Sequence, residues 1–177
     1  FIAVLFLPFS FLSYPTATLL WFFLEIGFVL ISAFMLLKLS FQKPGFMPYL
    51  LFVSILLAWN PFLAEMRSGQ LMILILVLLC LALFCIKSGK DWVAGLLLGL
   101  TISIKLITWP LLLWLVFTRR WRAVLAAGGA IVVLHLLAAC FLGLGAIKYY
   151  YLTVSPTVFQ AYIQNHYNLS GWALAWR

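Results

Sequence analysis

A single cation, Lys105, stands in the middle of an apolar stretch, residues 93–117, that holds no other charged residue. An ammonium group is costly inside a bilayer, and an ionisable residue at such depth usually faces a ligand, an ion path or water. No acidic residue lies near Lys105 in the sequence. The pattern therefore favours contact with an anion such as a lipid phosphate. The alternatives are a structural ion pair, for which Glu25 is the candidate partner, and a side chain that extends to the membrane surface.

A second group of polar residues occupies the short segment 60–70, NPFLAEMRSGQ. The carboxylate of Glu65 can accept hydrogen bonds from sugar hydroxyls or orient a base, and the guanidinium of Arg67 can clamp a phosphate through two parallel hydrogen bonds. A salt bridge between them that only holds the loop is the alternative. Gln70 opens the next apolar run, where its amide can contact a ligand or satisfy backbone groups.

A third candidate, His166, lies in the polar run QNHYN near the C-terminal end. Imidazole titrates near neutral pH, so His166 can transfer a proton or hydrogen-bond a phosphate or a sugar. An ordinary loop histidine is the alternative. His135 stands alone in an apolar run and is interpreted as a packed residue with a hydrogen-bond partner.

The composition places these residues in an integral membrane protein. Hydrophobic residues make up 67% and charged residues 8% of the 177-residue chain, and the mean hydropathy is +1.22, whereas about a quarter of the residues of soluble proteins are charged. The net charge of +8 comes from short basic clusters between apolar runs. Such clusters set membrane orientation, so we expect no nucleic-acid binding. The three cysteines lie within apolar runs, where sulfur behaves as a small hydrophobe, so neither a disulfide nor a metal site is expected.

Apolar runs long enough for helices alternate with these clusters, and the sequence therefore predicts an all-α, polytopic membrane helical bundle. The predicted helices outside the stretch around Lys105 cover residues 16–37, 46–59, 71–86 and 123–144. Residues 60–70 are interpreted as a connection, and residues 145–177 as a segment outside the membrane. Because the sequence begins inside an apolar run and stops at the start of another helix, we expect a single transmembrane domain over residues 1–177, truncated at both ends.

Residues 93–117 differ from the other runs because basic residues stand at both ends. Lys and Arg gather on the cytoplasmic side of membrane proteins, so this stretch should enter the membrane and return to the same side. Gly95 and Gly99 form a GxxxG pattern in its first arm, which predicts close packing against another helix. The flanking basic residues are Lys87, Lys90, Arg119, Arg120 and Arg122.

The middle of this stretch should contain a break. Two arms of about a dozen residues would each reach about 18 Å into a hydrocarbon core of about 30 Å. Pro110 lacks an amide hydrogen and disfavours helix at the residue before it, which places the break near residues 105–110. Non-helical backbone at that depth needs protein or water around it. The sequence therefore predicts a broken or re-entrant helical hairpin in which Lys105 faces a wet cavity.

The order of these features resembles the family 87 glycosyltransferases, membrane enzymes of the GT-C superfamily related to polyprenol-phosphate-mannose-dependent mannosyltransferases. The resemblance covers nearly the whole chain. Its most specific part is a glycine-rich helix, an Ile-Lys pair, and a proline before a basic turn. The stretches that carry it are FLPFSFLSYP, NPFLAEMRSGQ, GLLLGLTISIKLITWPLLLWL followed by RRWR, and NHYNLSGWALAWR.

This resemblance implies transfer of a hexose, mannose or a similar sugar, from a polyprenyl phosphate to a lipid or glycan acceptor on the extracytoplasmic side. In the superfamily an acid in the first outer loop acts as the general base, and that loop would lie before Phe1, so neither Glu25 nor Glu65 is assigned to this role. No cofactor or metal is implied, and the partners are membrane lipids, the donor and the acceptor. His166 would assist. The implied donor-binding residues are Lys105, Arg67, Glu65, Gln70 and, by alternative matches to an asparagine-containing run of the family, Asn165 and Asn168.

Two other functional classes fit the residues alone. Broken helices with charges at mid-depth also mark transport sites, so a transporter or flippase for an amphiphilic anion is the alternative to the transferase. A purely structural membrane subunit is the third reading, and it predicts that Lys105 is dispensable.

Overall fold

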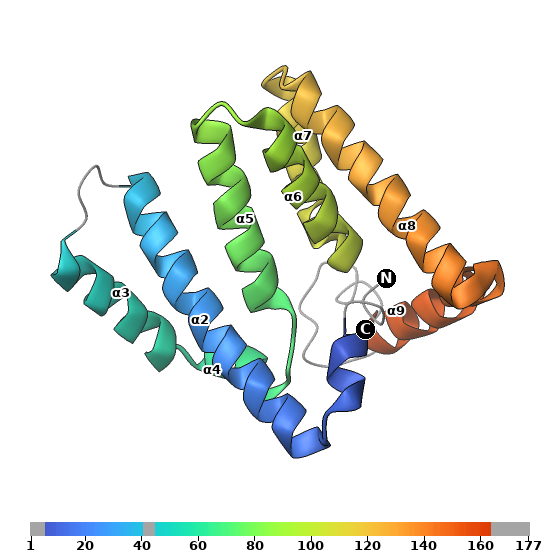
Figure 1. Cartoon of the computed structure of the whole chain (residues 1–177), viewed down its shortest axis with the longest axis horizontal. Coiled ribbons are helices and arrows are strands. Elements are labelled where there is room, and N and C mark those ends of the chain that lie inside the picture. Colours follow the sequence, from blue (N-terminus) through green and yellow to red (C-terminus); the bar gives the residue numbers. More distant parts are fainter. Residues whose placement is uncertain (1–5, 41–44, 164–177) are drawn as a thin grey trace. The chain divides into compact units, whose positions relative to one another are not determined.

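The structure, a computed structural model, describes residues 6–40 and 45–163 of the chain. Every regular element within these two ranges is helical, which confirms the predicted all-α bundle (Figure 1). In chain order the elements are the 3-10 helix η1 (Leu7–Phe11), α2 (Tyr14–Ser40), α3 (Phe46–Ala58), α4 (Asn60–Arg67), α5 (Met72–Lys87), α6 (Asp91–Ile104), the 3-10 turn η2 (Leu106–Thr108), α7 (Pro110–Phe117), α8 (Trp121–Tyr149), the π-helical turn η3 (Tyr150–Val154) and α9 (Ser155–Ile163).

The chain divides into two compact units, Phe1–Leu134 and His135–Arg177. The first unit contains α2 to α7 and the beginning of α8, and the second contains the rest of α8, η3 and α9. Four of the predicted site residues lie in the described part of the first unit: Glu65, Arg67, Gln70 and Lys105.

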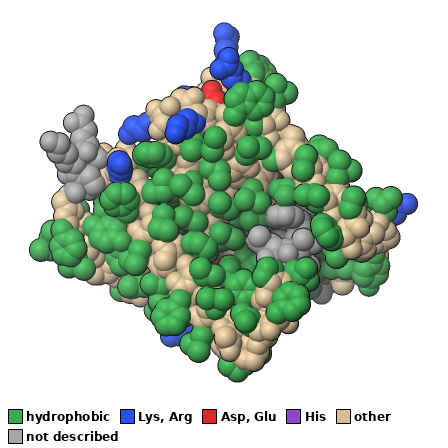
Figure 2. Space-filling model, viewed as in Figure 1, with side chains coloured by type: hydrophobic (Ala, Val, Ile, Leu, Met, Phe, Trp, Pro, Cys, Tyr) green, Lys and Arg blue, Asp and Glu red, His purple; other side chains and the backbone are tan. Residues whose placement is uncertain are grey.

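Two helical stretches are long and apolar enough to cross a membrane: α2, with 27 residues, and Trp121–Ala161, which begins with α8. The shorter apolar helices include α3, α5 and α6. Many large apolar side chains of these helices are exposed (Figure 2). Extensive apolar surface of this kind is expected where helices face lipid rather than water.

The central helix of the first unit is α5, which lies between α2 and α6 and packs against both (Figure 1). One buried cluster joins α2, α4 and α5, and a second joins the start of α5 to the end of α6. The start of α5 is therefore fixed beside the end of α6. The buried residues of the two clusters are Val29, Phe62 and Ile73, and Leu71, Ile75 and Ile104.

The GxxxG pattern in α6 packs directly against the backbone of α8, which confirms the predicted close approach of another helix. A Cβ atom added at Gly95 would overlap the carbonyl oxygen of Ala123, and one added at Gly99 would lie 2.5 Å from the carbonyl oxygen of Ala127. Only glycine permits such an approach. This contact fixes the first turns of α8 against α6.

The predicted broken hairpin is present, with its break at the expected place. The helix α6 ends at Ile104, and Lys105 is extended, with φ −140° and ψ 126°. The turn η2 follows, and α7 begins at Pro110, where a missing amide hydrogen is harmless in a first helical turn. Thr108 lies across the break, and its Oγ1 donates to Thr101 Oγ1 at 3.3 Å. Residues 105–109 are called the broken end of the hairpin below.

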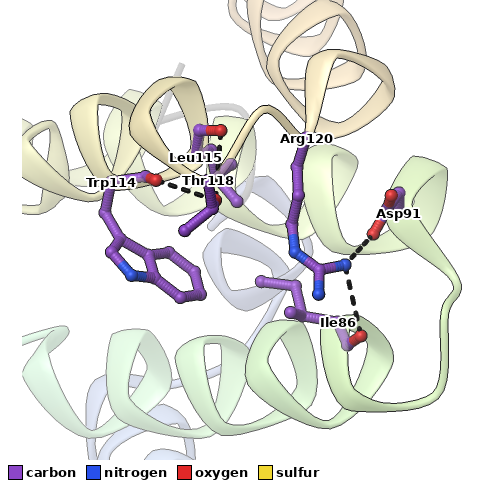
Figure 3. Close-up of polar contacts among 6 residues, drawn as sticks. All are labelled: Ile86, Asp91, Trp114, Leu115, Thr118 and Arg120. Atoms are coloured by element: carbon purple, nitrogen blue, oxygen red, sulfur yellow. Dashed lines mark hydrogen bonds and ion pairs between the residues drawn. The ribbon is translucent and has the colours of Figure 1, made fainter.

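At the other end of the hairpin the two arms meet. Nη1 of Arg120, which follows α7, donates to Oδ1 of Asp91, the first residue of α6, at 2.6 Å, and to the carbonyl oxygen of Ile86 at 3.4 Å (Figure 3). The end of α7 therefore lies beside the start of α6. The turns 87–91 and 118–122 that meet here are called the basic end below.

Residues 60–70, interpreted from the sequence as a connection, contain a short helix, because residues 60–67 form α4 between α3 and α5. Pro61 occupies the first turn of this helix, a position where proline favours helix formation. Gly69 ends the helix with φ 61°, and the amide of Gln70 donates to the carbonyl oxygen of Glu65 at 3.2 Å. This Schellman turn fixes Gln70 directly after the last turn of α4.

In the second unit the expected partner of His135 is found. Its Nε2 lies 2.9 Å from the hydroxyl oxygen of Tyr151, and the two rings stack with centroids 6.3 Å apart. Gly143, with φ 79°, interrupts the regular geometry of α8 between them. The imidazole is thus satisfied within its own unit, as predicted.

Candidate functional site

Lys105 and Gln70, two of the predicted site residues, contact each other. Nζ of Lys105 donates to Oε1 of Gln70 at 2.9 Å, although they stand 35 positions apart. They meet because α5 and α6 run antiparallel, so the start of one lies beside the end of the other. The amide is neutral, and Lys105 has no acidic partner in the part of the chain that the structure describes. Within the described residues the positive charge at the broken end is therefore not neutralised.

Glu65, five residues before Gln70 in the chain, has a carboxylate oxygen without a hydrogen-bond partner among the described residues. This oxygen, Oε2, is buried. Buried polar atoms of this kind are uncommon, and they are found where a ligand or water completes the hydrogen bonding. Glu65 is therefore suited to accept a hydrogen bond from a ligand hydroxyl.

Glu25 is not the partner of Lys105. Its carboxyl group is fully buried and interacts electrostatically with Glu65. The indole of Trp21 lies near it, but neither carboxyl oxygen of Glu25 forms a hydrogen bond of good geometry. The reason is the face of α2 involved: Glu25 stands one helical turn before Val29, which packs in the cluster that joins α2 to α4.

Arg67 does not form the salt bridge with Glu65 that the sequence left open. The two residues stand two positions apart on α4, and residues with that spacing point to different faces of a helix. Arg67 is exposed. The described structure therefore groups Lys105, Gln70 and Glu65 near the broken end, and it leaves Arg67 on the surface of α4.

An apolar groove with a volume of about 630 Å³ lies between α4, α5 and the η2–α7 segment. Its size is in the range of pockets that bind small molecules. Among the lining residues only Glu65 is ionisable, and the others are aromatic or aliphatic apart from Thr108. The lining comprises Trp59, Phe62, Glu65, Met72, Ile73, Ile75, Leu76, Leu79, Ile107, Thr108, Pro110 and Leu111.

The sequence predicts that Lys105 faces a wet cavity, and the groove found next to it in the described structure is apolar. The groove begins at Ile107 and Thr108, two and three residues after Lys105, and its walls are apolar. Lys105 is partly buried and lies beside the groove rather than inside it. A groove of this composition suits a hydrocarbon chain better than water. The sequence could not show it, because its walls come from three separate elements.

The remaining predicted site residues, Asn165, His166 and Asn168, lie outside the residues that the structure describes.

One signal in the sequence could have placed Glu65 at the groove. Phe62 and Glu65 stand three positions apart and therefore share one face of α4, and both line the groove.

Taken together, the described residues form a bundle of apolar helices with an apolar groove and an unneutralised cation beside it. The sequence matches the profile of glycosyltransferase family 87 over residues 1–176. The chain therefore belongs to glycosyltransferase family 87, as its motifs predicted. Comparison with curated proteins and with solved structures found no significant match.

Proposed function

We propose that this glycosyltransferase moves a hexose, mannose or a similar sugar, from a polyprenyl phosphate to a lipid or glycan acceptor on the extracytoplasmic side of the cell membrane, which it crosses several times. One observation carries the proposal. An ammonium group that donates to a neutral amide stands beside an apolar groove at the break of a hairpin. A polyprenyl phosphate has the matching chemistry, an anionic head on a hydrocarbon chain.

The two parts of the donor would occupy two different environments. Part of the prenyl chain would lie in the apolar groove, where Trp59 and Leu79 are among the lining residues. The phosphate would lie against Nζ of Lys105, whose charge favours an anion in a site of low polarity. The amide of Gln70 accepts from Lys105 through its oxygen, which leaves its NH₂ group to donate to a phosphate oxygen.

The proposed reaction is a direct displacement at the anomeric carbon. The acceptor oxygen forms a bond to that carbon, the bond from the carbon to the phosphate oxygen breaks, and the acceptor proton passes to a general base. By the family resemblance this base would be an acid of an outer loop, and neither Glu25 nor Glu65 is assigned to that role. The leaving phosphate gains negative charge, and Lys105 would stabilise it. Glu65 would accept hydrogen bonds from sugar hydroxyls, since its buried Oε2 has no partner in the described structure.

Four further residues remain candidates for the same site. Arg67 would contact the phosphate from the exposed face of α4, and Asn165 or Asn168 would contribute an amide. His166 would assist proton transfer or bind the sugar. We expect the reaction to need no metal or other cofactor besides the donor.

The proposal is tested by assaying the complete protein in liposomes with radiolabelled polyprenyl-phosphate hexoses and a lipid extract that supplies acceptors. Lys105→Met keeps the length of the side chain and removes its charge. We expect it to lower kcat/KM by about 100-fold or more, in line with the loss of one group that stabilises developing negative charge. Lys148→Met, at an exposed cation of the second unit, is the matched control and should stay within about twofold of the wild type.

Two results would contradict the proposal. Full transfer by Lys105→Met would remove Lys105 from the donor site. Movement of the labelled donor between leaflets without transfer to any acceptor would support the alternative, a transporter or flippase for an amphiphilic anion.

A further inference from the structure

A second apolar groove, of about 490 Å³, lies between α6 and the first part of α8. Trp92, Leu96 and Leu100 stand four positions apart and form one wall along α6. The groove is deep on the side of α8 because small residues line it there, Gly129 and Ala130 among them. Eight residues of α6 span about 12 Å, so the groove is long enough to hold part of an acyl chain.

This groove begins at the basic end of the hairpin. Trp92 follows directly after Asp91, and Arg122 stands one helical turn before Leu125 and Ala126, which also line the groove. Lys and Arg side chains are visible at the corresponding edge in Figure 2. One end of the groove is therefore cationic while its length is apolar.

The cations at this end are not all engaged by the protein. Arg120 is paired with Asp91, and Nζ of Lys87 donates to the carbonyl oxygen of Leu39 at 2.8 Å. The other three are exposed and have no acidic partner in the described ranges: Lys90, Arg119 and Arg122. A cluster of like charges repels itself unless an anion is present.

The backbone of Arg119 adds an independent observation. Arg119 has φ 57°, whereas glycines occupy the corresponding left-handed position after α4 and α5, Gly69 with φ 61° and Gly89 with φ 73°. Glycine is the favoured residue in this conformation, because it has no Cβ atom. A cation thus occupies a position that disfavours it, as is often found where a side chain has a function besides folding.

We infer that the groove between α6 and α8 binds an anionic glycerophospholipid, with its phosphate at Lys90, Arg119 and Arg122 and an acyl chain along Trp92, Leu96 and Leu100. Charge complementarity selects this occupant. A zwitterionic lipid would bring its own cation to three cations, and an apolar helix of a second copy would leave their charge unmatched. The site lies at the opposite end of the hairpin from Lys105, so it is separate from the proposed donor site and does not depend on it.

The occupancy of the groove is tested with a pair of glycine variants. A Cβ atom at Gly129 or at Gly128 meets no atom within 4 Å, so a side chain can leave the backbone at both positions without a clash. Gly129 lines the groove and Gly128 does not. The full protein is released from bilayers of equal parts phosphatidylglycerol and phosphatidylcholine, and the retained lipids are counted by native mass spectrometry.

We expect the wild type and Gly128→Leu to retain phosphatidylglycerol in preference to phosphatidylcholine, and Gly129→Leu to lose that preference. Arg122→Gln should lower the preference about fivefold, the usual effect of one Lys or Arg near anionic lipid. Lys148→Gln, which removes an exposed cation of the second unit, should not change it. High salt should weaken the preference of the wild type.

Three results would overturn the inference. The first is equal retention of the two lipids by the wild type, which would mean only ordinary contact with the bilayer. The second is an unchanged preference in Gly129→Leu. The third is a wild-type protein with the mass of a dimer and a Gly129→Leu variant with the mass of a monomer. That result would mean that a second copy of the chain occupies the groove.

Discussion

The two ends of the α6–α7 hairpin each hold a cation, but in opposite circumstances. At the basic end Arg120 is 2.6 Å from the carboxylate of Asp91, so its charge is matched and joins the two arms (Figure 3). At the broken end the side chain of Lys105 donates a hydrogen bond to the neutral amide of Gln70. A cation with an acid beside it serves the fold, whereas a cation with only an amide beside it remains available to a ligand.

Two turns of the same backbone geometry place Gln70 near the broken end and Arg120 at the basic end. Gln70 and Arg120 each stand three residues after the last residue of a helix, Arg67 or Phe117. Each donates its amide hydrogen to a carbonyl oxygen five residues back, that of Glu65 and of Leu115 respectively. These are Schellman turns. The backbone therefore sets where the side chain lies, and the residue type sets whether that end of the hairpin is structural or open to a ligand.

The largest expected effect comes from breaking the packing near the basic end. Gly95→Leu would place a side chain against the backbone of Ala123, where a Cβ atom alone already overlaps. Backbone cannot yield as a flexible side chain can, so we expect a loss of stability of about 4 kcal/mol or more. The measurement is the fraction of monodisperse protein after heating in detergent. Gly128→Leu, which meets open space, is the control, and similar melting of the two variants would contradict the described contact.

A variant that makes the broken end resemble the basic end should have the next largest effect. Gln70→Glu gives Lys105 a carboxylate at the position of the present 2.9 Å hydrogen bond. We expect the KM for the polyprenyl-phosphate donor to rise about tenfold or more, since the carboxylate competes with the donor phosphate and repels it. Stability should rise by up to about 1 kcal/mol. Gln70→Ala, which adds no charge, is the control and should change KM only a few-fold. An unchanged KM in Gln70→Glu would show that Lys105 does not contact the donor.

The smallest effect is expected when the ion pair at the basic end is removed. Asp91→Asn leaves the side chain in place and takes away its charge. Because Arg120 and Asp91 are 33% and 23% exposed, solvent screens the pair, and the loss should be about 0.5–1 kcal/mol. Thermal unfolding in low and high salt measures it, and the difference between wild type and variant should shrink in high salt. Transferase activity should not change, and a large loss of activity would place the basic end in the catalytic machinery.

The hairpin and its break were predictable because the responsible signals are local. Pro110 constrains its own backbone and that of the residue before it, and the basic residues on both sides of residues 93–117 fix the two ends on one side. The same is true of Gly95 and Gly99, whose spacing alone predicts close packing.

The partners of the charged residues were not predictable in the same way. The carboxyl group of Glu25 is buried on the face of α2 that packs towards α4 rather than paired with Lys105, and no spacing along the chain predicts that. The helix at residues 60–67 was missed for a different reason. It has only eight residues and follows directly after another helix, although Phe62 and Glu65 share one of its faces.

The lengths of the helices around the broken end carry a consequence for the lipid around them. The helices α3 and α5 have 13 and 16 residues, which correspond to about 20 and 24 Å. A hydrocarbon layer of about 30 Å that both helices cross would have to thin to match them, at a modest energetic penalty per ångström. Such thinning would bring the surrounding headgroups closer to Lys105, so that the proposed polyprenyl-phosphate donor could present its phosphate without leaving its own leaflet.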